Sequence, residues 1–519
     1  MTPPRGPRRW LLPAVVALAV PLFWHAAHRP VPLGADADHY TALSVARHLA
    51  RGDGYLNGIV YPVSLSFPFA ARVPQPLLER PWAVPLLALP PVALSRGDPA
   101  AAVLWSQRLW PWWLGLLAAT GVALLRRRGR RAAPWIWTGG LLVSPLLAMT
   151  AHWCQLELPA ALLLLLLWRR TAGGAEPQAE RIAATDGERR RGAVDGLLWA
   201  GLTGLRGELF WLPPLWIAAA APHGRRGRRL LAAAAVWLAL SAPWAARNWR
   251  VAGSPWFTLQ AWTEHLKETP AHPGYTIYTQ PRGEPLSTTL RKRPALVGRK
   301  AAAGGKYYLR RAGRWLEPAL WIWLVLAAVW PGPERRRLRL LLLSAGLLAA
   351  LYAPFSHTLR YMALLLPVLL LEAWDGIEAA ALAVAAGGKT GRRARRWALA
   401  AVAAAGLLLT GGVPPRLAGW EHAAAAARRD AARLPAAVAA ARAARPGPLF
   451  SDTAAVLWWS GREGVWWPGP QPPAPWLARA VPSLAGAPWI RLGGTSVDQS
   501  QDQSAQNADR QRQHDQQQR

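Results

Sequence analysis

The sequence predicts an all-α polytopic membrane protein with a small α/β unit near its C-terminal end. Hydrophobic residues make up 52% of the 519 residues. They gather in blocks, several of which approach the ~20 apolar residues that an α-helix needs to cross a bilayer. Clusters of arginine separate these blocks, as cytoplasmic turns do in polytopic proteins. The blocks occupy residues 11–22, 103–125, 135–148, 156–168, 230–242, 315–330, 338–353, 362–371 and 397–410.

The charge of the chain is strongly positive, with 61 Lys and Arg against 28 Asp and Glu and a net charge of +33. Taken alone, such a charge favours a nucleic-acid-binding protein. Only 17% of the residues are charged, and the chain carries 32 tryptophans and several apolar blocks. This composition excludes a nucleic-acid-binding protein. The single cysteine, Cys154, excludes an intramolecular disulfide framework.

The arginine clusters give the expected path of the chain through the membrane. Short loops rich in Lys and Arg stay in the cytoplasm, so we interpret each cluster as a solvated cytoplasmic turn. This interpretation puts the N-terminus inside, the C-terminus outside and about 11 crossings between them. The clusters occupy residues 126–131, 169–170, 189–191, 225–229, 335–339 and 392–396.

Three stretches need a separate interpretation. The block at 11–22 follows a basic N-terminus but lacks a clean small-x-small cleavage site, so we expect a retained first span and not a cleaved signal peptide. Residues 82–94 are apolar but short and rich in proline, which favours an interfacial or re-entrant element. Residues 193–221 are too few for two full spans, so we expect a short hairpin or broken helices bent near Arg206-Gly207-Glu208.

We expect three regions along the chain. Residues 1–412 form the transmembrane domain, with long outer loops at 29–102 and 247–314. Residues 413–492 form a small extracytoplasmic domain, which combines an Ala/Arg helical stretch at 421–445 with a strand-like run at 448–452. Residues 493–519 are rich in Gln, Asp, Ser and Arg, a composition typical of disorder.

Two carboxylates, Asp36 and Asp38, come directly after the first span, at the start of an amphipathic helix that ends at Gly52. Either one could be only the N-cap of a helix that starts near His39. The functional alternative is a general base held at the outer face of the membrane. No phosphate-binding glycine loop, dinucleotide fingerprint, zinc-protease motif or nucleophile elbow is present in the sequence.

The residues around these carboxylates resemble the first outer loop of the GT-C glycosyltransferases. The resemblance is greatest to the bacterial branch related to protein O-mannosyltransferases and the lipid A aminoarabinose transferase. Five further motifs occur in the same order as in that branch, over roughly residues 10–470. The matching stretches are Asp36-x-x-x-Tyr40 with Ala46-Arg47 and Gly52-x-Gly54-Tyr55, then Glu79-Arg80-Pro81-Trp82, Thr203 to Glu208, Pro243-Trp244-x-x-Arg247-Asn248, His357-x-x-Arg360-Tyr361, and Ser451-Asp452 through Trp466-Trp467-Pro468.

The resemblance implies a membrane glycosyltransferase of the cell envelope, integral to the bacterial plasma (inner) membrane. It implies a sugar donor linked to polyprenyl phosphate, an acceptor that is an unknown lipid, glycan or protein, and no nucleic acid. An aspartate would deprotonate the acceptor as it attacks the anomeric carbon, with inversion. Position 37 is alanine where the motif has an acidic neighbour, so the choice between Asp36 and Asp38 stays open. The resemblance also allows a divalent metal ion, although no His/Asp set with metal spacing occurs in the sequence.

The candidate phosphate-binding residues are Arg80, Arg247 and Arg360, because the planar guanidinium donates two hydrogen bonds to two phosphate oxygens. The alternative for each is an interfacial arginine that extends to lipid head groups. Arg206 and Glu208 could likewise pair with each other inside the broken hairpin. The candidate substrate-binding residues are Tyr40, Tyr55, Arg206, Glu208, His357 and Tyr361.

Two other classes of function remain open. A polytopic lipid or glycolipid transporter (flippase) would be expected to carry an inverted repeat, and no repeat is visible in the sequence. A non-catalytic scaffold would keep the membrane shell without the chemistry. Most of the tryptophans are interpreted as interfacial anchors, because indole rings favour the head-group zone.

Overall fold

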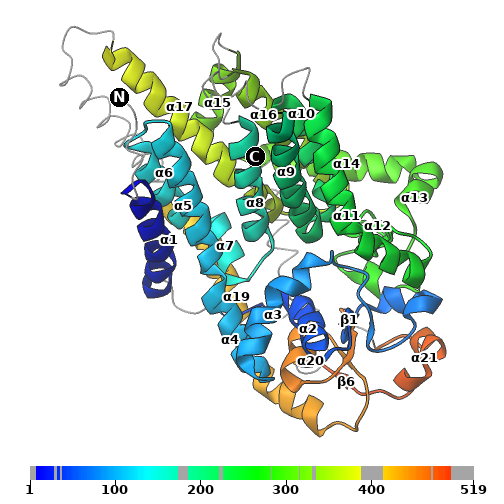
Figure 1. The fold of residues 1–519 in the computed structure, drawn as a ribbon. Helices are drawn as coiled ribbons and strands as arrows, with labels where there is room; N and C mark the ends of the chain where they lie inside the picture. The colour runs from blue at the N-terminus through cyan, green and yellow to red at the C-terminus, as the bar shows by residue number, and fades with distance from the viewer. Residues whose placement is uncertain are drawn as a thin grey trace, which may run out of the picture.

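A computed structural model describes ten stretches of the chain, which together form a helical bundle with a small layer of strands at one end (Figure 1). Asp36, the apolar block at 397–410 and the tail at 493–519 lie outside the described residues. The described residues are 8–27, 32–34, 38–172, 185–220, 226–281, 283–314, 316–329, 335–386, 413–468 and 472–492.

Several helices have the length and composition to cross a membrane. Within the described ranges, three stretches qualify: α1 (Arg8–Ala27), α4 with α5 (Pro99–Leu109 and Pro111–Arg127) and α11 (Arg226–Ala252). A fourth is formed if α7 (Pro145–His152) and α8 (Glu157–Ala172) act as one broken span. The chain bends by 119° at the break between these two helices. The shorter apolar helices are α3 (Ala83–Ser95), α6 (Ala133–Val143) and α15 (Pro318–Val329). The expected number of about 11 crossings stays a prediction.

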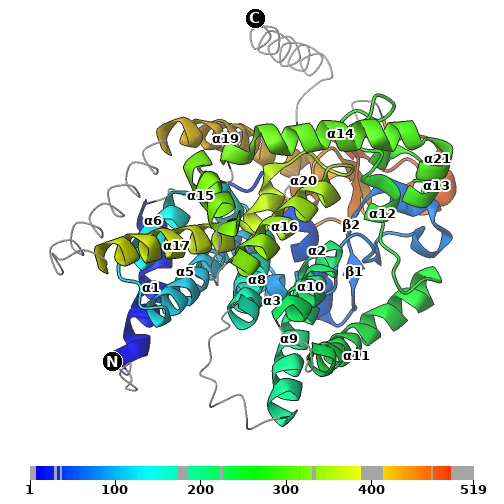
Figure 2. The ribbon, with the colours of Figure 1, turned by 90° about the horizontal axis from the view of Figure 1, so that it is seen from above.

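The remaining helices fill the bundle and its two ends. They are α2 (Asp38–Arg51), α9 (Thr185–Leu205), α10 (Leu212–Ala220), α12 (Gln260–Thr263), α13 (Leu286–Lys292), α14 (Pro294–Arg310), α16 (Arg335–Tyr352), α17 (Leu366–Ala386), α19 (Val413–Ala443), α20 (Ala454–Ser460) and α21 (Trp476–Ala480). Figure 2 shows α17 beside α5 and α6, against which it packs.

The expected break in 193–221 lies where the sequence indicated. Helix α9 ends at Leu205, a 3-10 turn covers Gly207–Leu209 and α10 follows. Helix α9 begins at Thr185, before the expected start, because its first turns continue through the arginines at 189–191. It packs closely on α11 at glycines, and a Cβ at Gly196 would meet the carbonyl oxygen of Ala233 at 2.5 Å. Small residues permit this approach between helices.

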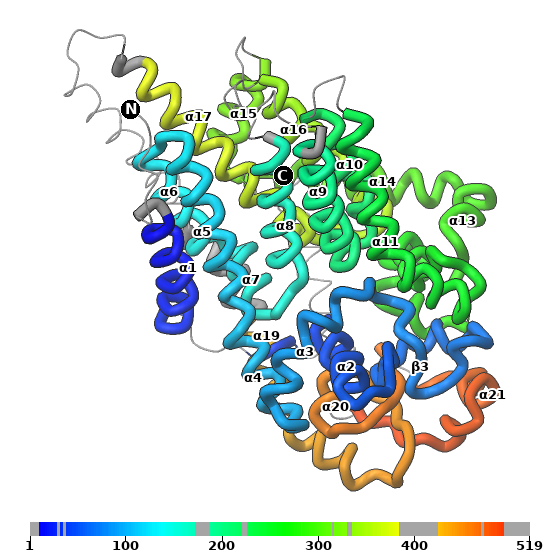
Figure 3. Tube along the Cα trace, in the orientation of Figure 1, coloured from blue at the N-terminus to red at the C-terminus, as the bar shows by residue number. Residues whose placement is uncertain are grey.

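The strands form a four-stranded parallel sheet in the order β2-β5-β4-β6. Strands β4 (Leu449–Ser451), β5 (Gly464–Trp466) and β6 (Trp489–Ile490) belong to residues 413–492, here called the C-terminal region. Strand β2 (Ile59–Val60) comes from residues 38–98, here called the first segment, where β1 (Leu56–Asn57) also pairs with β3 (Gln75–Pro76). The C-terminal region therefore shares one sheet with the first segment, and Figure 3 shows the two intertwined.

Side chains reinforce this junction. Trp458 donates from its indole nitrogen to the carbonyl oxygen of Pro99 at 3.1 Å. Trp459 donates to the Tyr40 hydroxyl at 3.3 Å. The bundle end formed by the first segment and the C-terminal region is called the cavity end below.

The arginine clusters at the opposite end are not all solvated turns, which corrects the interpretation from the sequence. Asp375 on α17 is buried and accepts hydrogen bonds from Arg128 and Arg130, each at 2.5 Å. Asp195 on α9 is buried between Arg170 at 2.6 Å and Arg229 at 2.7 Å. Because a buried carboxylate needs a charged partner, these arginines join helices as well as facing solvent.

Candidate functional site

A cavity of about 1200 Å³ lies where the first segment, the bundle and the C-terminal region meet. Its walls come from stretches that are far apart in the sequence. They include the N-terminus of α2, residues 77–82, the turn after α9, one side of α11, residues 255–278, residues 351–361 and Trp466. It gathers most of the charged residues that the sequence singled out.

Asp38, in the first turn of α2, is held by two arginines of the cavity wall. Arg80 forms a short ion pair with one carboxylate oxygen, and Arg360 donates to the other at 2.8 Å. Burial alone would raise the pKa of Asp38, but the charges of Arg80 and Arg360 lower it well below its usual value. In the structure Asp38 is therefore an ionised partner of two cations.

A second set of ion pairs adjoins the first. Glu157, at the start of α8, is almost fully buried and pairs with Arg206. Its Oε1 atom also lies 3.5 Å from Nε of Arg360. Arg206 reaches Glu208 at 3.3 Å, and Glu208 accepts a hydrogen bond from the Tyr352 hydroxyl at 2.7 Å. The proposed pairing of Arg206 with Glu208 is thus present, together with a further partner that anchors the arginine.

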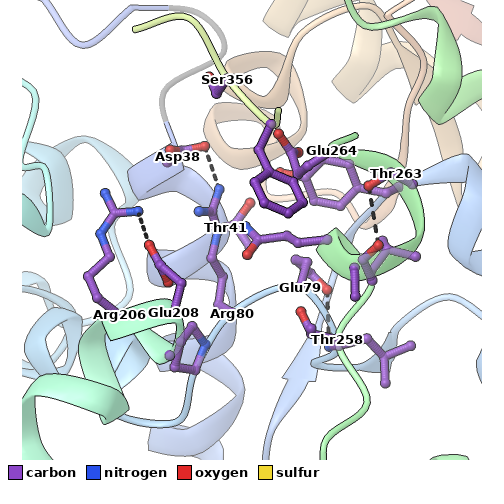
Figure 4. Close-up of a pocket in the computed structure, with 18 of the residues that line it drawn as sticks. Asp38, Thr41, Glu79, Arg80, Arg206, Glu208, Thr258, Thr263, Glu264 and Ser356 are labelled. Atoms are coloured by element: carbon purple, nitrogen blue, oxygen red, sulfur yellow. Dashed lines mark hydrogen bonds and ion pairs between the residues drawn. The ribbon is translucent and has the colours of Figure 1, made fainter. Parts of the chain in front are cut away.

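Tyr361 lies between these two sets. Its ring stacks on Tyr352 with centroids 4.2 Å apart. The guanidinium carbons of Arg206 and Arg360 lie 5.0 Å and 5.1 Å from its centroid, which is cation–π distance. Figure 4 shows Arg206 and Glu208 on one side of Arg80, and Glu264 with Thr263 on the other.

Four of the sequence candidates lie outside the cavity lining. Arg247, near the end of α11, donates to the carbonyl oxygen of Leu77 at 2.7 Å and lies over the Trp244 ring at 4.7 Å. Its position fixes the backbone that precedes Arg80. The prediction that Arg247 contacts phosphate stays a prediction.

The other three candidates make structural contacts. Tyr40 is buried and accepts the hydrogen bond from Trp459. Tyr55 packs edge-to-face on Trp244 with centroids 5.2 Å apart. His357 contacts the carbonyl oxygen of Ala353 at 3.2 Å and stacks near Tyr307. Each lies close to a residue of the cavity wall, so each helps to shape it.

Aromatic side chains form another part of the cavity wall. The rings of Trp237 and Trp256 stack with centroids 6.4 Å apart. Trp237, Trp244 and Ser241 place one side of α11 along the cavity, and much of this helix is exposed on its other side. The tryptophans that line the cavity are Trp82, Trp153, Trp211, Trp237, Trp244, Trp256 and Trp466. The cavity therefore combines a cluster of paired arginines and carboxylates with many tryptophan side chains.

Three residues close to or lining this cavity were not predicted from the sequence, namely Glu157, Glu264 and Lys267. Glu157 is the acidic residue at the edge of an apolar block, which is a costly place for a charge and could have marked it. Four of the five lysines of the chain fall between Lys267 and Lys306, a local enrichment that could have marked the second loop. Within the described ranges, no group of three or more His, Cys, Asp or Glu side chains could hold a metal ion.

Comparisons with known proteins give a fold. No protein-family model matches the sequence, and no curated protein matches it significantly. The structure is similar to the crystal structure of ArnT from Cupriavidus metallidurans bound to undecaprenyl phosphate, with a TM-score of 0.52 and 17% identity, over 93% of this chain and 90% of that one.

Two further solved structures are similar at lower scores. ArnT from Cupriavidus metallidurans in the apo state has a TM-score of 0.47 and 17% identity, over 87% of this chain and 84% of that one. The apo oligosaccharyltransferase from Archaeoglobus fulgidus has a TM-score of 0.44 and 12% identity, over 88% of this chain and 64% of that one. The first of the three similarities shows that this chain shares its fold with ArnT, in line with the resemblance seen in the sequence.

Proposed function

We propose that this protein is a membrane glycosyltransferase that moves a sugar from a polyprenyl-phosphate carrier to an acceptor at the outer face of the membrane. The observation that carries the proposal is the composition of the cavity, which joins a cluster of arginines and carboxylates to a tryptophan-rich wall. A lipid phosphate is amphiphilic in the same way. The structural neighbour ArnT was crystallised with undecaprenyl phosphate, which supports this class of donor.

Arg80 and Arg360 are the proposed phosphate-binding pair. Both line the cavity, and both already hold an anion, the Asp38 carboxylate. Guanidinium groups can bind two phosphate oxygens and stabilise the charge that develops as the phosphate departs. Arg206 is instead occupied by Glu157 and Glu208, so its proposed role is to position Tyr361.

The proposed base is Asp38, and Asp36 is kept as the alternative. In the structure Asp38 is a weak base, because two arginines stabilise its ionised form. A donor phosphate would compete for these arginines, release the carboxylate and raise its pKa. The freed carboxylate takes the proton of the acceptor hydroxyl as the oxygen attacks the anomeric carbon. The bond from that carbon to the phosphate oxygen breaks with inversion, and polyprenyl phosphate leaves.

The test is donor cleavage without a known acceptor. Purified protein in nanodiscs is incubated with undecaprenyl-phosphate mannose, N-acetylglucosamine or arabinose, and release of undecaprenyl phosphate is followed by mass spectrometry. We expect slow hydrolysis of at least one donor. The R360Q variant should lose donor affinity by about 10- to 100-fold, as expected for a lost charged hydrogen bond. The matched control is R299Q, an exposed arginine of α14.

Two outcomes would count against the proposal. Equal cleavage by R360Q and R299Q would remove the arginine pair from the mechanism. Movement of intact donor between leaflets without cleavage would favour the transporter in place of the transferase.

A further inference from the structure

A second group of side chains lines the same cavity beside the arginines, and it consists mainly of aromatic rings. Tyr61, Tyr275, Tyr278 and Trp466 are here called the aromatic platform. Tyr61 lies 5.2 Å from Tyr278 and 5.1 Å from Trp466, measured between ring centroids. Tyr275 lies 6.1 Å from Tyr278 and 5.7 Å from Trp466. The four rings come from the first segment, the second loop and strand β5.

Charged groups flank the platform. The Tyr278 hydroxyl donates a short hydrogen bond to Glu264, which also lines the cavity. The Lys267 ammonium lies 3.9 Å from Glu264 and 4.3 Å from the centroid of Tyr275. The platform therefore offers ring faces, a carboxylate acceptor and an ammonium donor within one part of the cavity.

The loop that carries these groups is fixed in place. The Lys300 side chain is buried and donates to the carbonyl oxygens of Glu264 at 2.8 Å and Phe355 at 2.9 Å. A further bond reaches the carbonyl oxygen of Lys267 at 2.5 Å. An ammonium group that donates to three backbone carbonyl oxygens holds the surrounding backbone in place. The loop is thus pre-organised, which lowers the cost of binding a ligand against it.

We infer that the aromatic platform, with Glu264 and Lys267, binds the glycosyl unit of the donor, an inference that rests on the proposed function. Ring faces pack against the C–H face of a pyranose or furanose, and the carboxylate and the ammonium bind its hydroxyl groups. Pockets for small polar ligands combine apolar walls with a few well-placed polar groups in this way.

The position of Tyr61 favours the donor sugar over an acceptor sugar. Tyr61 lines the cavity together with Arg80 and Arg360. In the donor, the sugar is bonded directly to the phosphate. If Arg80 and Arg360 bind that phosphate, the first sugar ring lies in the cavity that the platform lines.

Two features separate the platform from ordinary core packing. Tyr275 remains 47% exposed although it touches two other rings, so it contributes little to the core. Glu268, which also lines the cavity, has a φ of 57°, a left-handed conformation that non-glycine residues rarely adopt. Such conformations gather at functional sites.

The test compares a sugar-bearing lipid with the bare lipid phosphate. Binding of undecaprenyl-phosphate mannose, N-acetylglucosamine and arabinose, and of undecaprenyl phosphate alone, is measured by native mass spectrometry in nanodiscs. We expect Y275A to lower the affinity for the preferred sugar-bearing lipid by about 3- to 10-fold, the range expected for the loss of one aromatic contact. Binding of undecaprenyl phosphate alone should not change. Y275F should keep wild-type binding, because it keeps the ring.

Two further variants sharpen the result. W249A removes a ring of α11 that is 63% exposed and outside the cavity lining, and it should leave binding of both lipids unchanged. E268G should keep or raise the melting temperature, because glycine accepts the left-handed conformation without strain. If the Glu268 carboxylate contacts the sugar, E268G weakens only the sugar-bearing lipid.

The outcomes separate this inference from the proposed function. A wild-type protein that binds undecaprenyl phosphate but prefers no sugar-bearing lipid overturns the inference alone. An equal effect of Y275A on both lipids overturns it as well. A wild-type protein that binds none of these lipids overturns the proposed function, and the inference with it.

Discussion

Nη2 of Arg360 donates to Oδ2 of Asp38 at 2.8 Å, which joins residues 322 positions apart in the sequence. Arg80 holds the other oxygen of the same carboxylate. The Asp38 carboxylate thus occupies both arginines of the proposed phosphate-binding pair. In the proposed mechanism the base and the phosphate site are coupled, because a phosphate that binds the two arginines releases the Asp38 carboxylate.

This coupling predicts opposite effects of D38N on binding and on chemistry. The amide has no charge with which to compete for Arg80 and Arg360, so undecaprenyl phosphate should bind more tightly to D38N than to the wild type. Transfer should fall at least about 100-fold if Asp38 is the base. Lipid binding and donor cleavage are measured on the same nanodisc preparations. Full activity in both D38N and D36N would disprove an aspartate base.

The same coupling predicts different pH profiles for kcat/KM and kcat. In the free protein the two arginines lower the pKa of Asp38 from 3.8, so the carboxylate stays ionised as the pH falls toward that value. The kcat/KM profile, which reports the free enzyme, should show no acid-side loss from Asp38 above about pH 4. Once phosphate occupies the arginines, the pKa rises, and the kcat profile should gain an acid limb at higher pH. Identical profiles for the two parameters would contradict displacement of Asp38.

The ion pairs of Asp375 with the arginine cluster at 126–131 predict that a substitution there lowers stability without lowering donor binding. Asp375 is buried and pairs with the partly exposed Arg128 and Arg130, so D375N leaves these two cations without their full counter-charge. The free energy of unfolding should fall by about 3 kcal/mol. Thermal unfolding in detergent provides the measurement, with R336Q as the exposed control from the cluster at 335–339. A melting temperature equal to that of R336Q would show that the pair contributes nothing.

The contact between α2 and the C-terminal region predicts a pH-dependent stability. Nε2 of His48 lies 3.3 Å from Glu463, and Nδ1 lies 3.0 Å from Asp53. The hydrogen bond to Glu463 raises the pKa of His48 above 6.5, and burial opposes the rise. This stabilisation is complete below about pH 6.5 and is lost as the pH rises through the raised pKa.

Between pH 6 and pH 9 the melting temperature of the wild type should therefore fall more than that of H48Q, by roughly 2 °C, which corresponds to about 1 kcal/mol or less. Scanning fluorimetry at both pH values measures the difference. Parallel changes in the two proteins would exclude His48 as the titrating group.

The apolar blocks predicted the long helices well, because a bilayer imposes a strong local requirement on length and composition. The blocks at 11–22 and 230–242 lie within α1 and α11. Strand β2 could not be predicted, because it has two residues and its partner β5 lies near the other end of the chain. The buried partners of the arginine clusters were also missed. Glu372, Asp375 and Glu378 fall three residues apart in α17 and could have indicated a buried charged face.

The site was predicted in part. Asp38, Arg80, Arg206, Glu208, Arg360 and Tyr361 all line the cavity, in agreement with their place in the motifs. Spacing gives no direction for a side chain, however. The sequence alone therefore could not show that the Arg247 guanidinium faces backbone carbonyl oxygens. The aromatic platform needs three separate segments, so no local pattern could reveal it.

The parallel pairing of Val60 with Val465 has a consequence for folding during synthesis. The ribosome releases Val60 long before Val465, so β2 must wait as an unpaired edge while nearly the whole membrane bundle is inserted. Trp466, one residue beyond the pairing, then closes the cavity wall. A chain that stops short of β5 lacks this part of the wall. The cavity that Asp38 lines is therefore complete only after β5 has been synthesised.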